Sequence, residues 1–188
     1  MEIRLKHRKP STELWKTLNG VALLLFWLGG QSWAFQSAAS KANDFFFVQI
    51  NLLCGALASE GLATRSWKNT GPEYQCISPY VDIGGAGPIG LTTNIAYYVT
   101  GRSPSRASNI ELVVNVNNGA AKERAKQKLQ AATKTLFGKI GNQPPSGLFA
   151  AIQGDKPFSS GQPYGTVSYT IERSGIETYT LSIRDTKR

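Results

Sequence analysis

Residues 110–140 read IELVVNVNNGAAKERAKQKLQAATKTLFGKI, a strand-like run, a short turn and a long helical run in succession. In the helical part apolar residues recur at steps of three and four, the spacing of one face of an α-helix; they are Ala121, Ala125, Leu129, Ala132, Leu136 and Ile140. An asparagine before Gly119 can cap this helix, and Gly141 can end it. The stretch therefore predicts a strand over 110–116 and an amphipathic helix over 120–140.

The remaining faces of this helix are basic, with Lys122, Arg124, Lys126, Lys128, Lys134 and Lys139. One interpretation is a solvated helix face, which places Lys126 on the surface. The other is a binding surface for an anionic partner: a lipid, a polymer or an envelope protein. Nucleic acid is disfavoured because aromatic residues that could stack on bases are not interleaved among these cations.

The strongest strand signal closes the chain. Residues 166–173 and 177–184 both alternate apolar and polar side chains, and Ser174-Gly175 joins them, so they predict a hairpin. Its two strands would bury one shared face, made of Val167, Tyr169, Ile171, Tyr179, Leu181 and Ile183.

Upstream of the basic helix, we expect strands over 73–78 and 91–100, with a turn at 69–72 before the first. A helix over 44–60, capped by Asn43 or Asp44, should end at Gly61, and a short helix should follow Pro144-Pro145. Residues 79–90 and 154–163 are predicted to be loops. The sum is an α+β fold, with an antiparallel or mixed sheet of about five to six strands and two main helices packed on one face.

The two cysteines, Cys54 and Cys76, favour a disulfide in an oxidising compartment. Such a bond would add roughly 3 kcal/mol of stability in the chain-entropy model. Two buried free thiols are the alternative interpretation. A metal pair is disfavoured because His7, the only histidine, lies in the N-terminal tail.

The N-terminus predicts export. Residues 1–16 form a basic tail, and residues 17–34 (TLNGVALLLFWLGGQSWA) form an uncharged apolar segment. This segment is predicted to be a signal peptide cleaved after Ala34 or a retained transmembrane anchor helix. A buried core helix is a third interpretation, which the adjoining basic tail disfavours. The basic tail favours translocation of the remaining chain, a linker over 35–43 and an exported domain over 44–188. That domain would be periplasmic or held at the inner membrane.

A glycine-rich stretch, Gly84, Gly85, Gly87 and Gly90, is a candidate loop site. Three of these glycines satisfy the G-x-G-x-x-G spacing of dinucleotide-binding loops. That mechanism needs a helix directly after the glycines, whereas Pro88 and a β-like run come next here. We therefore expect a turn-rich rim and predict no cofactor.

Catalytic constellations are not recognisable in the exported part. A nucleophilic serine or cysteine needs a base, and no histidine occurs after His7. The acidic residues are scattered without a metal-loop or paired-acid pattern, so we identify no catalytic or metal-ligating residues. The leading hypothesis is a non-enzymatic binding or accessory domain of the bacterial envelope. The alternatives are an exported hydrolase of envelope polymers and a secreted effector or inhibitor.

One combination of features carries a family resemblance. A helix containing Cys54 is followed by Gly61, Trp67 and the run Tyr74-Gln75-Cys76-Ile77-Ser78, and then by strands and an amphipathic helix. Over about residues 45–183 this resembles a group of bacterial exported proteins defined only as a domain of unknown function. The resemblance implies no activity and no site residues.

Overall fold

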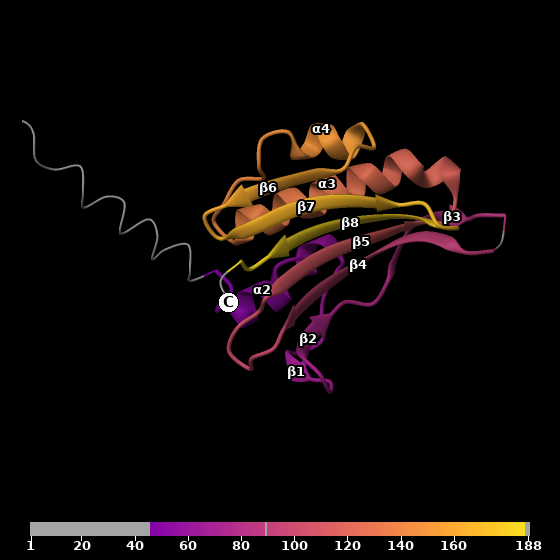
Figure 1. Cartoon of the computed structure of the whole chain (residues 1–188). Helices are drawn as coiled ribbons and strands as arrows, with labels where there is room; N and C mark the ends of the chain where they lie inside the picture. The colour runs from indigo at the N-terminus through magenta and orange to yellow at the C-terminus, as the bar shows by residue number, and fades with distance from the viewer. Residues whose placement is uncertain (1–45, 89, 187–188) are drawn as a thin grey trace, which may run out of the picture.

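The computed structural model describes residues 46–88 and 90–186 (Figure 1). The predicted tail, apolar segment and linker lie outside the described residues. Among the described residues, no helix has both the length and the apolar character needed to cross a bilayer.

An antiparallel sheet of eight strands forms the centre of the domain. Its path runs β1-β2-β4-β5-β8-β7-β6, and β3 pairs with β4 beside β2. The bounds are β1 (Lys68–Asn69), β2 (Tyr74–Ile77), β3 (Val81–Ala86), β4 (Thr92–Gly101), β5 (Asn109–Val116), β6 (Phe158–Gln162), β7 (Gly165–Glu172) and β8 (Glu177–Arg184). The predicted α+β class is confirmed, and every strand pairing of the sheet is antiparallel.

The helices pack on one face of this sheet (Figure 1). The basic helix is α3 (Lys122–Lys139), entered through the short 3-10 turn η2 (Gly119–Ala121), and α4 (Leu148–Gln153) follows it. Asn118 caps η2 by accepting a hydrogen bond from the Ala120 N–H. The predicted first helix is shorter than expected: α2 spans only Ile50–Gly55, and η1 (Ala58–Glu60) ends at Gly61 in the left-handed conformation.

The core lies between the helices and the inward side chains of the strands. The alternation in the terminal hairpin is confirmed, since Val167 faces Ile183 and Tyr169 faces Leu181, all buried. The apolar stripe of α3 is also confirmed, because Ala125, Leu129, Ala132 and Leu136 are at most 1% exposed. These residues fix which face of the sheet is covered.

The predicted disulfide is present. Cys54 of α2 is bonded to Cys76 of β2, with Cα atoms 5.9 Å apart. Cys76 is buried and Cys54 is packed against the core. The bond therefore joins the first helix to the sheet, as its two positions predicted.

Two predicted loops are strands instead, and the two-residue β1 overlaps the predicted turn at 69–72, so the sheet has eight strands and not five or six. Residues 81–86 form β3, where the glycines permit close packing: a Cβ on Gly84 would lie 2.9 Å from the Ala121 Cβ. Residues 158–162 form β6, an edge strand that pairs with β7. Both runs lack a clear apolar alternation, so neighbouring strands rather than local pattern determine their conformation.

Candidate binding surface

The face of the sheet opposite the helices is lined by polar side chains, and we call it the open face. Its residues alternate with the buried ones along each strand. In the central strands it carries Asn94, Thr100, Asn109, Glu111, Asn115, Thr178, Thr180 and Arg184. Short hydrogen-bonded ladders cross it: Thr178 donates to Asn115, and Asn115 donates to Asn94. The open face is thus a rigid polar surface supported by a packed core.

One line of side chains crosses this face without interruption, and we call it the polar row. The strand register places Lys68 beside Gln75, Gln75 beside Thr100, Thr100 beside Asn109 and Asn109 beside Arg184. Arg184 in turn lies beside Thr166 of β7. The polar row therefore has a cation at Lys68, a cation at Arg184, and only amides and hydroxyls between them.

At the Lys68 end the surface is hollowed. An open hollow of about 370 Å³ is lined by Arg65, Ser66, Lys68, Thr70, Gln75, Ile77, Ser78 and Pro79. Two cations and no carboxylate line it. Arg65 and Lys68 are exposed, and neither forms an ion pair within the described part of the chain. This basic hollow, at the β1–β2 end of the open face, has the charge and shape to receive an anionic group.

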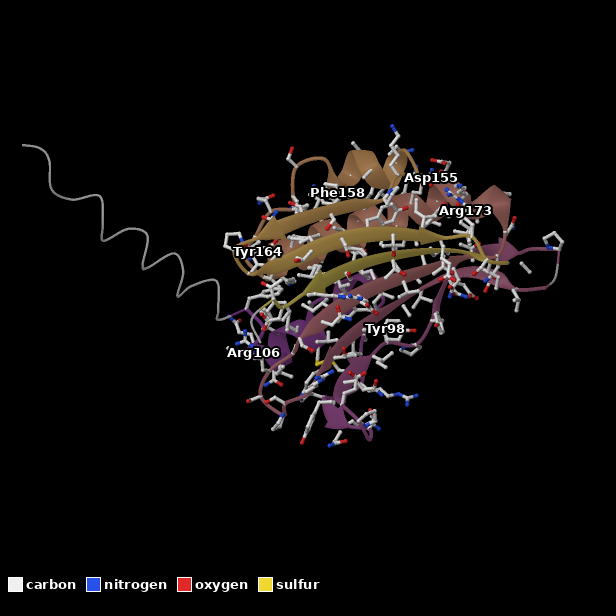
Figure 2. All side chains as sticks on the ribbon, viewed as in Figure 1. Tyr98, Arg106, Asp155, Phe158, Tyr164 and Arg173 are labelled. Atoms are coloured by element: carbon white, nitrogen blue, oxygen red, sulfur yellow. A yellow bond between two sulfur atoms is a disulfide. The ribbon has the colours of Figure 1, made fainter. Side chains whose placement is uncertain are left out.

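Two tyrosines lie on the same side of the sheet as the hollow. Tyr98 of β4, labelled in Figure 2, is cross-strand from Ile77. Its hydroxyl donates to the Tyr80 hydroxyl at 2.9 Å. Burial, followed by the hydrogen bond to Tyr80, raises the pKa of Tyr98. The phenol therefore stays protonated at neutral pH. Tyr80 is 56% exposed, so its ring is available to a partner on this face.

The basic residues of α3 are arranged differently from the expectation. Lys126 is 3% exposed, so its predicted place on the solvated surface is wrong. Its ammonium lies 3.0 Å from Asp155 and 3.1 Å from Glu123, and it also donates to the Gln153 carbonyl. Because a buried ammonium is stable only when hydrogen-bonded and paired, the fold surrounds it with acceptors from α3 and the end of α4.

Lys122 completes what we call the charged cluster, made of Lys122, Glu123, Lys126, Asp155 and Glu177. Its ammonium lies 3.0 Å from Asp155 and 3.1 Å from Glu177. Asp155, labelled in Figure 2, also accepts a hydrogen bond from the buried Tyr179. Asp155 adopts a φ of 51°, a left-handed conformation uncommon outside glycine. The charged cluster thus joins α3, the turn after α4 and the β7–β8 hairpin.

The pKa directions in this cluster result from its pairing. Burial alone lowers the pKa of Lys126, but hydrogen bonds to Asp155 and Glu123 outweigh it, so the pKa is raised. Lys122 behaves in the same way through Asp155 and Glu177. Burial alone raises the pKa of Asp155, and hydrogen bonds from the two lysines lower it overall. Both lysines are therefore held protonated, which removes them as general bases at neutral pH.

The other four cations of α3 divide into two pairs. Lys128 binds Glu60 at 3.0 Å, and Arg124 lies 3.5 Å from the Ile83 carbonyl. Lys134 and Lys139 are exposed and form no ion pair within the described residues. Of the six residues predicted as a binding surface, Arg124, Lys134 and Lys139 are exposed without an ion pair among the described residues, and Arg124 is held by the Ile83 carbonyl.

The glycine site is placed in a hairpin. Gly84 and Gly85 belong to β3, and Gly87 and Gly90 form its turn, in which the Gly87 N–H donates to the Leu91 carbonyl. A Cβ on Gly87 would lie 2.2 Å from the Asn117 carbonyl oxygen. At Gly84 and Gly87, then, the glycines let the hairpin pack against the start of α3.

Within the described ranges, no group of three or more histidine, cysteine or acidic side chains is placed to hold a metal ion. The polar row and the hollow were not predicted from the sequence. Each strand shows its polar positions, but their alignment depends on the strand order and register. The one sequence pattern that points to the polar row is the alternation of polar with apolar residues in each strand.

Comparison with known proteins identifies a family. A family of unknown function, DUF6030, matches residues 51–188, and the chain belongs to it. The expected resemblance to a domain of unknown function is therefore confirmed. No curated protein and no solved structure gives a match.

Proposed function

We propose that this DUF6030 protein is an exported, non-enzymatic binding or accessory domain of the bacterial envelope, which holds an anionic partner on its open face. Export is supported by the basic tail and apolar segment of residues 1–34. The disulfide is in keeping with an oxidising compartment. The domain would then be periplasmic or anchored in the inner membrane with the domain outside.

The observation that carries the binding function is the basic hollow. Arg65 and Lys68 line it together with neutral polar groups, and no carboxylate lies among the lining residues. Unpaired exposed cations raise the local concentration of anions and form charge-assisted hydrogen bonds with them. By contrast, Lys122, Lys126 and Lys128 already bind carboxylates, so a new anion would have to displace those partners.

Binding is tested with the full-length protein in detergent and with dextran sulfate as the polyanion, compared with uncharged dextran. The double variant Arg65→Ala/Lys68→Ala should lower the affinity for dextran sulfate by about tenfold or more, since two charged contacts are lost. The matched control is Lys134→Ala/Lys139→Ala, which removes the same charge from exposed, unpaired positions on α3. Equal losses in both double variants would mean that net charge, not the hollow, binds the polymer.

Export has a separate test. A reporter enzyme that is active only in the periplasm should be active when fused after Arg188. Activity seen only with a reporter that requires the cytoplasm would contradict the proposed location.

A further inference from the structure

We infer that the partner of the open face is an unbranched acidic polysaccharide that lies across the strands, along the polar row from the hollow to Arg184. The inference rests on the proposed function, and it adds the class of ligand, its direction on the sheet and its minimum length. It names a second anchoring cation, Arg184, that lies outside the hollow.

The direction is set by the register. Lys68 and Arg184 belong to strands four positions apart along the sheet, with Gln75, Thr100 and Asn109 between them. Neighbouring strands lie about 4.8 Å apart, so the two cations are separated by about 19 Å. Both are exposed, and among residues 46–88 and 90–186 the one carboxylate paired with Arg184 is that of Glu111, at a long distance of 4.0 Å. A ligand that meets both charges must be a chain of several units.

The chemistry between the two cations suits a sugar chain. The side chains of Gln75 and Thr100 each offer both a donor and an acceptor, and Asn109 adds the N–H donors of its amide. Sugar hydroxyl groups donate and accept along the whole length of a polysaccharide, so they match such a mixed surface.

An aromatic surface lies next to the polar row. Tyr98 is two residues from Thr100 on the same face of β4, and it holds the exposed Tyr80 through their hydroxyl groups. Aromatic rings present a flat apolar surface beside a polar tip. The C–H faces of sugar rings pack on such surfaces, which gives a polysaccharide apolar contacts that a small anion in the hollow lacks.

An acidic peptide fits this geometry less well. Extended peptides bind sheets mainly by pairing their backbone with an edge strand. The polar row instead crosses the face of the sheet, where backbone groups of the strands are already paired with one another. A chain lying on the row can use only side-chain partners, which favours a ligand with polar groups on every unit.

The test uses the full-length protein and two defined oligomers of galacturonic acid, a disaccharide that fits the hollow and an octasaccharide that is longer than the row. The octasaccharide should bind at least tenfold more tightly than the disaccharide. Arg184→Ala should remove most of that advantage without changing the affinity for the disaccharide. The matched control is Arg173→Ala, because Arg173 is similarly exposed and also contacts a carboxylate, but lies off the row.

The outcomes separate this inference from the proposed function. If both oligomers bind equally and Arg184→Ala changes neither affinity, the ligand does not extend along the polar row. Anion binding in the hollow would still hold. If neither oligomer binds while dextran sulfate does, binding depends on charge density and not on sugar units along the row, so this inference fails and the proposed function stands. If octaglutamate binds more tightly than the octasaccharide and with the same dependence on Arg184, the ligand is a peptide and the inference fails. If no polyanion binds at all, the proposed function is wrong, and this inference is wrong with it.

Discussion

The charged cluster and the basic hollow both contain lysine, but in contrasting environments. In the cluster, Lys126 is buried and surrounded by Asp155, Glu123 and a backbone carbonyl. In the hollow, Lys68 is exposed and no acidic side chain lines the surface. The difference is one of pairing: a lysine that is satisfied within the fold stabilises it, and a lysine left unpaired at the surface is available to a partner. Mutations should separate these two roles.

The largest effect is expected at Lys126. Lys126→Ala removes a buried side-chain stem together with an ammonium that donates to Asp155, Glu123 and the Gln153 carbonyl, so the free energy of unfolding should fall by about 3 to 5 kcal/mol. Lys134→Ala, on the exposed face of the same helix, should change it by less than about 0.5 kcal/mol. Chemical denaturation of the full chain measures both. Similar values would mean that the charged cluster contributes no more than a solvated surface does.

The disulfide provides a second test of this comparison, because it links α2 to β2 beside the hollow and does not touch the charged cluster. The double variant Cys54→Ser/Cys76→Ser should lose about 3 kcal/mol, because the bond closes a loop with a sequence separation of 22 residues. Hydrogen exchange should increase most in α2, β1 and β2, and least around the charged cluster. A uniform increase across the domain would show that the two regions unfold as one unit.

Acid should weaken the charged cluster and spare the hollow. The pKa of Asp155 is below its ordinary value of 3.8 because the lysine hydrogen bonds outweigh burial. Its contribution is therefore complete above that value and is lost as the pH falls through the lower folded pKa. The raised pKa values of Lys122 and Lys126 act oppositely: their contribution is complete below 10.5 and is lost as the pH rises through the higher folded pKa. Unfolding measured from pH 7 down to pH 2 should show a smaller loss in Lys126→Met than in the unmodified protein.

The smallest stability effect is expected in the hollow. Arg65→Ala/Lys68→Ala should change the free energy of unfolding by less than about 0.5 kcal/mol per residue, because both side chains are exposed and unpaired. The same variant should retain the acid response of the unmodified protein. A large loss of stability would show that the hollow is structural, and it would remove the reason for placing a ligand there.

Local pattern predicted the elements that bury a regular face. The apolar stripe of α3 and the shared apolar face of the β7–β8 hairpin are both present as predicted. The pattern is reliable in these elements because a shift by one residue would expose a buried leucine or tyrosine. The bond between Cys54 and Cys76 also agrees with the prediction, which rests on two cysteines in a chain predicted to be exported.

What the sequence could not supply was the set of contacts between distant segments. Lys126 looks like a surface lysine until α4 brings Asp155 against it, 29 positions further along the chain. β3 and β6 have little strand pattern of their own and are held by β4 and β7. The polar row depends on the order of five strands, and no single strand encodes it. Pairing across long separations therefore determined both the errors in the fold and the candidate site.

The bond between Cys54 and Cys76 also determines how a pulling force would pass through the domain. If the proposed N-terminal segment is retained as an anchor, tension on it would reach the domain at the buried Phe46 and Phe47 and then at α2. Without a covalent link such a load would peel α2 from the core, one contact at a time. The disulfide instead passes the force into β2, which is hydrogen-bonded antiparallel to β4 within the sheet. Because β2 also lines the basic hollow, such a load in an anchored protein would reach the proposed binding surface.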